Sequence, residues 1–212
     1  MKYYEMTYDY EKAEKYDYLM CTSSSLEDKY GYYIENSELN NYLGEDKIDV
    51  MHTVISGFKV KKFWEKTTLY YSPLENNNLE IFTDFLNNSY GWVLVSDKFI
   101  KLTEKYIKGE VEYLDVYVEN KDNKNIREDY KIINIIKVLD ALDLQNSIYH
   151  SIDKEGYIFG LKKYALNNDI VKGSNIFRLH NQIDIIFVSE NIKNVIEENN
   201  LTGFNFKEVK LV

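Results

Sequence analysis

The sequence has few of the residues that build covalent or metal-bound frameworks. Cys21 is the only cysteine in 212 residues, which excludes an internal disulfide and a thiolate metal cluster. The three histidines, His52, His150 and His180, are far apart and form neither a His-x-x-x-His nor a His-Glu-x-x-His motif. We therefore expect no metal and no cofactor, and the lone thiol suits a reducing compartment.

Long apolar runs and nucleotide-binding motifs are also missing. No stretch of about 18 apolar residues occurs, which argues against a membrane span, and residues 1–5 lack the apolar run of a secretory signal. The 9 glycines are scattered, without a Gly-x-x-x-x-Gly-Lys-Ser/Thr, Gly-x-Gly-x-x-Gly or Gly-x-Ser-x-Gly pattern. These absences give no support to nucleotide binding or α/β-hydrolase chemistry, and they predict a cytoplasmic protein.

Positive charge is scarce relative to negative charge. The 26 Lys and Arg against 35 Asp and Glu give a net charge of −9, which argues against broad binding to nucleic acid or anionic membranes and suits a basic partner. A hydrophobic content of 44% and a charged content of 29% are typical of a globular protein. The 20 tyrosines reflect either an AT-rich coding genome or a tyrosine-rich contact surface.

One stretch of the sequence occurs twice, at residues 92–118 and 185–211. Each copy begins with an apolar strand, continues through an amphipathic helix and ends, after a glycine, in a second strand. Equivalent positions are separated by 93 residues, as in the pairs Val95 and Val188, Tyr113 and Phe206, and Val116 and Val209. This spacing predicts an internally duplicated strand-helix-strand unit.

Single residues mark the helix boundaries in both copies. Ser96 and Ser189 suit the N-cap, because a hydroxyl accepts hydrogen bonds from the free N–H groups of the first turn. Gly109 and Gly203 suit the left-handed residue that ends a helix.

In both exit strands the apolar alternation shifts by one residue. The shift falls near Leu114-Asp115 in the first copy and near Lys207-Glu208 in the second. A two-residue period that slips once predicts a β-bulge or a sharp bend.

The remaining patterns predict an α+β fold with a mixed, largely antiparallel sheet and a few helices. The apolar run from Tyr130 to Asp143 favours a strand covered on both faces, with a buried helix as the alternative. Helical spacing predicts a short amphipathic helix through Leu79, Phe82, Phe85 and Leu86. We expect one domain over residues 1–212, with a variable N-terminal part at 1–78 and a core at 79–212.

One polar group of residues is a candidate for chemistry. Asp140 and Asp143 follow an apolar strand, and Ser147 comes four residues later. Two carboxylates in this position suit acid–base catalysis. We favour the alternative, in which they hold a turn by accepting hydrogen bonds from backbone N–H groups or from Arg178. In that interpretation Arg178 is a buried or half-buried partner of a carboxylate.

A local cluster of lysines interrupts the acidic sequence. It comprises Lys59, Lys61, Lys62 and Lys66, interleaved with Phe58, Phe63 and Trp64. Cations among aromatic side chains are typical of single-stranded nucleic-acid binding. Against the net charge of −9 we favour a strand whose lysines face solvent or protect a sheet edge.

Several short motifs in the last two thirds of the chain occur together in a fixed order. They are Thr83-Asp84-Phe85-Leu86, Gly91 to Ser96, Val138 to Asp143 with Ser147, Lys172-Gly173 with Ile176 to Leu179, and Phe187-Val188-Ser189 through Leu201 to Phe206. The set resembles the eleventh family of polymorphic-toxin immunity proteins. The likeness covers residues 80–212, and residues 1–78 match weakly.

The resemblance implies a cytoplasmic antidote that binds a cognate toxin domain in a stoichiometric complex, without being an enzyme. It places Asp140, Asp143, Ser147 and Arg178 at signature positions, where they serve either the fold or the toxin. It also suggests the weakly matching first third as the place of partner specificity. Two other functions stay open, namely a small enzyme using Asp140 and Asp143, and a nucleic-acid-binding module using Lys59–Lys66.

Overall fold

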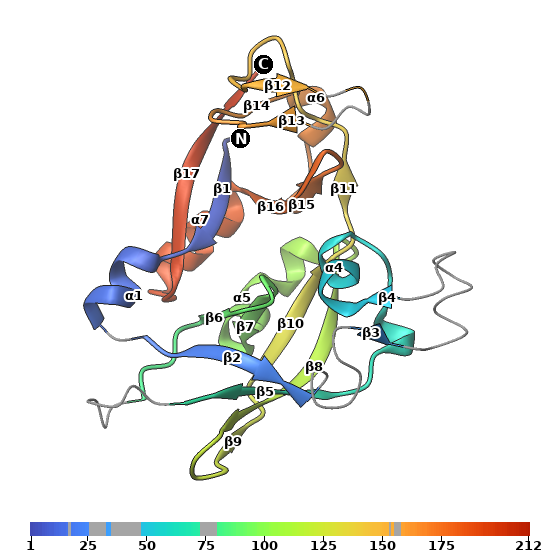
Figure 1. Ribbon diagram of the computed structural model, residues 1–212. Helices are drawn as coiled ribbons and strands as arrows, with labels where there is room; N and C mark the ends of the chain where they lie inside the picture. The colour runs from blue at the N-terminus through green and yellow to red at the C-terminus, as the bar shows by residue number, and fades with distance from the viewer. Residues whose placement is uncertain (17, 26–32, 35–47, 73–79, 153, 155–157) are drawn as a thin grey trace.

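The computed structural model describes residues 1–212 except 17, 26–32, 35–47, 73–79, 153 and 155–157 (Figure 1). Strands dominate, in mixed and antiparallel sheets with a few helices, which confirms the predicted α+β class. No helix within these described residues is long and apolar enough to cross a membrane.

Six strands close into a ring that we call the first barrel. In order of pairing they are β2 (Met20–Ser24), β6 (Phe85–Asn88), β7 (Val93–Ser96), β10 (Tyr130–Ile135), β8 (Val111–Asn120) and β5 (Thr67–Tyr71). Because β5 also pairs with β2, the last strand meets the first. The short β9 (Ile126–Arg127) extends β8 as a hairpin.

A second ring, the second barrel, is built in the same way. Its strands are β11 (Val138–Leu139), β15 (Ile176–Leu179), β16 (Gln182–Ser189), β1 (Tyr3–Tyr8), β17 (Phe204–Leu211) and β14 (Ala165–Leu166). An antiparallel bridge between Leu142 and Leu166 closes this ring. Figure 1 shows the second barrel above the first.

The other elements cover or connect the barrels. They are α1 (Tyr10–Tyr16), β3 (Tyr33–Ile34), β4 (Ile48–Asp49), α4 (Val50–Ile55), the 3-10 helix η1 (Lys61–Phe63), α5 (Asp97–Ile107), β12 (Ser151–Ile152), β13 (Ile158–Phe159), α6 (Asn168–Val171) and α7 (Glu190–Glu198). Helices α5 and α7 contact each other, and each connects two strands of its own barrel.

The strand pairing follows the same register in both barrels. Tyr130 faces Ser96 in the first barrel, as Tyr3 faces Ser189 in the second. The central strands β10 and β1 also pair in the same register with β8 and β17. There Leu114 faces Ile132, and Lys207, 93 residues after Leu114, faces Glu5. The two repeat windows therefore hold the same element types, whereas their descent from one duplicated unit stays a prediction.

The central strand of each barrel comes from a different place in the chain order. In the first barrel β10 follows β8 and lies between β7 and β8. In the second barrel that central place is taken by β1, from the opposite end of the chain.

The β-bulges predicted in the exit strands are absent from β8 and β17. The register runs without a shift from Val111 to Asp115 against β10, and from Phe204 to Val209 against β1. The shifted alternation has another cause, because each strand buries one face at its start and the opposite face at its end. Val111 belongs to the central core, whereas Val116 points into the first barrel.

The predicted helix through Phe82, Phe85 and Leu86 is wrong in its described part, since Phe85 begins strand β6; Leu79 lies outside the described residues. Phe85 and Leu86 are both buried, but they belong to different cores. Successive side chains of a strand point to opposite faces, so each of the two residues packs into the core on its own side of β6. The strand predicted from Tyr130 is confirmed over Tyr130–Ile135 and is covered on both faces.

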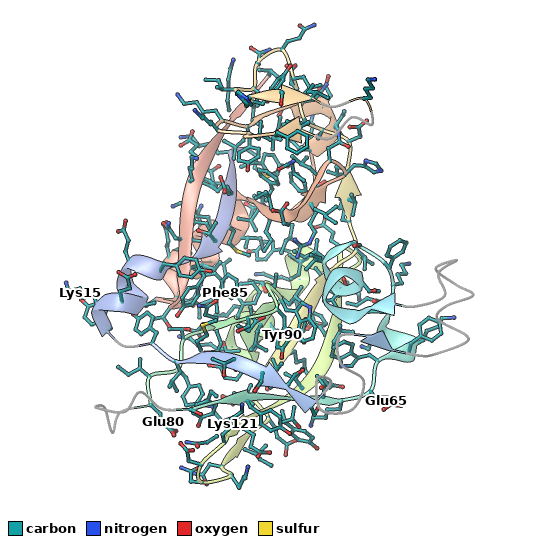
Figure 2. The ribbon with its side chains drawn as sticks, in the orientation of Figure 1. Lys15, Glu65, Glu80, Phe85, Tyr90 and Lys121 are labelled. Carbon is teal, nitrogen blue, oxygen red and sulfur yellow. The ribbon has the colours of Figure 1, made fainter. Side chains whose placement is uncertain are left out.

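Three cores hold the molecule together. One fills the first barrel and includes Leu94, Leu114 and Ile132. A smaller one fills the second barrel around Phe177 and Phe187. The third lies between the barrels and contains the buried sides of α5 and α7. Figure 2 shows Phe85, a member of this central core, where the upper and lower parts of the molecule meet.

The predicted helix boundaries are confirmed in part. Ser96 Oγ accepts a hydrogen bond of 3.2 Å from the Phe99 amide, as an N-cap should. Ser189 also occupies an N-cap, but its hydroxyl donates instead to Asn175 Oδ1 at 2.8 Å. Gly109 follows the C-cap of α5 with a φ of 84°, the left-handed conformation predicted there. The prediction for Gly203 is wrong, because α7 has its C-cap at Asn199 and the left-handed residue that follows is Asn200, with a φ of 50°, whereas Gly203, with a φ of 89°, lies beyond it.

Polar contacts link the two barrels. The Glu110 carboxylate, which follows α5, accepts hydrogen bonds from the Asn175 and Ile176 amides at the start of β15 and from Lys137 Nζ at 2.7 Å. In the opposite direction, Asp84 accepts a bond of 2.9 Å from the amide of Thr202, which follows α7. Each barrel thus holds the loop after the helix of the other.

Candidate functional site

The signature residues Asp143 and Ser147 form one turn next to the bridge that closes the second barrel. Asp143 Oδ1 accepts the Asn146 amide at 2.8 Å. Ser147 Oγ donates to the Asp143 carbonyl at 2.6 Å and accepts the Ala165 amide at 3.0 Å. This turn therefore anchors β14, the last strand of the ring. Asp140 is exposed, and its carboxylate makes no hydrogen bond with any described residue.

We expect Asp143→Ala to lower the free energy of unfolding by about 1–2 kcal/mol, because the Asn146 amide loses its acceptor in a half-exposed turn. Asp140→Ala, in the same segment, should change it by less than about 0.5 kcal/mol. Chemical denaturation of both variants measures the difference. Equal losses would show that the turn does not depend on Asp143.

Arg178 is buried, but no ion pair joins it to a carboxylate in the described part of the chain. It is 1% exposed, its Nη1 donates to the Ile183 carbonyl, and its Nε has no described hydrogen-bond partner. Burial lowers the pKa of Arg178 to about 10, and the negative charge of Asp184 partly opposes that shift. Of the two kinds of donor predicted for these carboxylates, Asp143 bonds to a backbone N–H group, and no bond from Arg178 to Asp140 or Asp143 is found among the described residues.

The four signature positions belong to two neighbouring strand ends. Val138 pairs in parallel with Arg178, so the chain that leads to Asp140 and Asp143 runs beside β15. Beyond that pairing the side chains separate, with Arg178 buried and Asp143 bound to Asn146. Asp140 and Asp143 share no hydrogen-bond partner in the described part of the chain, so their contacts give no support to the acid–base interpretation.

A hollow of about 260 Å³ opens beside the Asp143 turn. It is lined by Glu5, Asn146, Lys163, Tyr164, Lys207, Glu208, Val209 and Lys210. Lys210 Nζ donates to Asn146 Oδ1 at 2.7 Å, which links the turn to β17. Burial, together with the charges of Glu5 and Asp184, raises the pKa of Tyr164 to about 12, so its hydroxyl keeps its proton at neutral pH.

Glu5 and Lys207 were not among the candidate site residues predicted from the sequence, although Lys207 marked a predicted bulge. One signal was present, because the spacing of 93 residues aligns Lys207 with the apolar Leu114. A charged residue in place of an apolar one in a repeated strand indicates that the two copies differ there in burial. No such signal existed for Glu5, since β1 lies outside both repeat windows.

The lysine cluster is placed differently from the predicted strand. Lys61 and Lys62 lie in the 3-10 helix η1, whose first amides bond to Glu112 Oε2. Lys66 pairs with Glu128 at 2.8 Å and lies over the ring of Tyr117. Part of the positive charge is therefore neutralised within the chain, which disfavours a nucleic-acid surface.

Reactive groups are sparse in the described part of the chain. Cys21 is a free, buried thiol, and burial raises its pKa to about 12, so it stays protonated. Among the residues that the structure describes, no three His, Cys, Asp or Glu side chains are grouped to hold a metal ion.

The chain was compared with known proteins and protein families. None of the curated proteins matches it. The model of the immunity protein family (Imm11) matches residues 12–211, which includes most of residues 1–78, where the resemblance in the sequence is weak. Since this match spans nearly the whole chain, the protein belongs to the Imm11 family of immunity proteins.

Proposed function

We propose that this protein binds a cognate toxin domain in the cytoplasm and neutralises it as a stoichiometric complex. The family match over residues 12–211 carries the proposal. The described residues support it, because Asp143 is engaged by Asn146 and the lysine cluster is partly paired within the chain. An inhibitor of this kind needs a complementary surface and no turnover.

The charge of the protein suggests the character of the toxin. A net charge of −9 speeds encounter with a basic protein, since long-range attraction raises the association rate more than the final affinity. We therefore propose a toxin domain whose binding face is basic.

We expect co-expression of this protein to rescue bacteria from the toxin domain encoded beside it, and the purified pair to form a stable complex. Titration of toxin activity should reach full inhibition near one protein per toxin, because binding is not catalytic. Protection far below that ratio would indicate an enzyme. Failure of both rescue and complex formation would contradict the proposed function.

The electrostatic contribution can be tested separately by measuring the kinetics of binding. We expect the association rate to fall as salt rises from low to physiological concentration, and the dissociation rate to change little, because salt screens the long-range encounter. An association rate that is independent of salt would contradict a basic toxin face while leaving complex formation intact.

A further inference from the structure

The two barrels differ at one pair of facing residues. In the first barrel Ile132 and Leu114 face each other across β10 and β8, and both are fully buried in the core. The matching pair in the second barrel is Glu5 and Lys207, across β1 and β17. Glu5 lies on the same side of β1 as Tyr3, which belongs to the core of the second barrel. A charged pair thus replaces two aliphatic side chains at the wall of a core.

The first barrel is closed at this point by its own chain. Trp64 packs edge-on against Trp92 at 5.8 Å between ring centroids, and its Nε1 donates to the Asp115 carbonyl at 2.9 Å. Asp115 corresponds to Glu208 in the second barrel, where the hollow lies instead. In the second barrel the hollow lies beside Glu208, and the aromatic side chain in its lining is Tyr164, which packs edge-on against Phe187.

One of the residues that line the hollow has a carboxylate oxygen without a hydrogen bond to any described residue. Glu5 Oε2 is buried and has no hydrogen-bond partner among the described residues. Lys207 Nζ is 3.9 Å away, on a side chain that is 64% exposed. A buried carboxylate oxygen without a hydrogen-bond donor can accept a hydrogen bond from a group that enters the hollow.

We propose that this hollow receives a cationic side chain of the toxin domain, whose head group donates hydrogen bonds to the Glu5 carboxylate. The inference rests on the proposed function, because the toxin supplies the occupant. The buried Glu5 oxygen, which has no hydrogen-bond donor among the described residues, is the feature that selects a cationic donor. Val209 and the Tyr164 ring line the wall, which suits the aliphatic stem of an arginine or lysine.

The lysines at the rim define the competing hypothesis. The same hollow is also lined by Lys163, Lys207 and Lys210. In the competing hypothesis an anionic group of the toxin binds these lysines, and Glu5 opposes its binding. Lys210 already donates to Asn146, and Lys207 is exposed enough to turn outward when a cation enters. The two hypotheses predict opposite effects for substitutions of Glu5 and Lys207.

The decisive variant is Glu5→Gln, which keeps the size of the side chain and removes its charge. Titration calorimetry against the toxin domain encoded beside this protein should show a dissociation constant higher by about 30-fold or more, as for other buried charged pairs that lose one partner. The melting temperature of the free variant should stay equal or rise, because the buried charge is gone. Weaker binding by a protein of undiminished stability is not expected from a merely structural residue.

Two matched variants complete the test. Glu197→Gln removes the same charge from the exposed face of α7, outside the hollow, and should change the dissociation constant by less than about twofold. Lys207→Met removes the internal competitor and should leave binding equal or tighter. Tighter binding by Glu5→Gln with weaker binding by Lys207→Met would establish an anionic occupant and overturn the inference. Unchanged binding by Glu5→Gln would also overturn it, whereas failure of the unaltered protein to bind would count against the proposed function itself.

Discussion

Replacing Glu110 by alanine is expected to lower the free energy of unfolding by about 3–5 kcal/mol, the loss typical of breaking a buried ionic contact. The Glu110 carboxylate accepts two backbone amides of the second barrel and the ammonium of Lys137. Its removal leaves these donors without an acceptor where water has little access, because the Glu110 side chain is 10% exposed.

The measurement is chemical denaturation of the variant beside Glu198→Ala. Glu198 is an exposed carboxylate at the end of α7, and its loss should change the free energy of unfolding by less than about 0.5 kcal/mol. Similar values for both variants would mean that Glu110 does not join the barrels. Two separate transitions in the Glu110→Ala variant would show that the barrels unfold independently once this contact is lost.

The second large effect is expected at Gly203, by comparison with Gly109. Both glycines follow a helix and have a positive φ, so alanine at either position strains the backbone by about 1 kcal/mol. A Cβ at Gly203 would also meet the Phe85 carbonyl and lie 2.9 Å from Thr83 Cβ, whereas a Cβ at Gly109 meets nothing within 4 Å.

We therefore expect Gly203→Ala to lower the free energy of unfolding by about 3 kcal/mol, the sum of backbone strain and overpacking, and Gly109→Ala by about 1 kcal/mol. Denaturation curves of the two variants give the difference directly. If both variants lose the same free energy of unfolding, the backbone at Gly203 can move away from Phe85 and Thr83 without a cost in stability.

The sequence predicted those features whose signal lies within a short window. The strand from Tyr130 was visible because its apolar residues are adjacent and β-branched, as a strand buried on both faces requires. The strand-helix-strand units were visible because helix periodicity and glycine stops occur within about 27 residues in each copy.

The closure of the barrels was not predictable in the same way. Strands β11 and β14 have two residues each, too few for any alternation to be recognised. The helix predicted through Phe85 and Leu86 failed for a related reason, since the spacing of apolar residues does not reveal that two cores lie on opposite sides of one strand.

The candidate site shows the same difference between local and long-range signals. Asp143 and Ser147 were found because a turn is local in sequence. Their separation from Arg178, and the hollow beside Glu5, depend on pairing between β1 and β17, which the sequence does not specify locally. Long-range pairing of this kind needs the whole fold before it can be recognised.

The place of β1 has a consequence for biosynthesis. Its residues are made long before their partners, because Tyr3 pairs with Ser189 and Val209, more than 180 residues later in the chain. During translation all six strands of the first barrel have been made by Ile135. At that point the second barrel still lacks β16 and β17, which pair with β1, and β15, which pairs with β16. The nascent chain must therefore carry an unpaired apolar segment until β16 and β17 have been made. We expect a slow-folding or aggregating intermediate at the step in which these strands pair with β1.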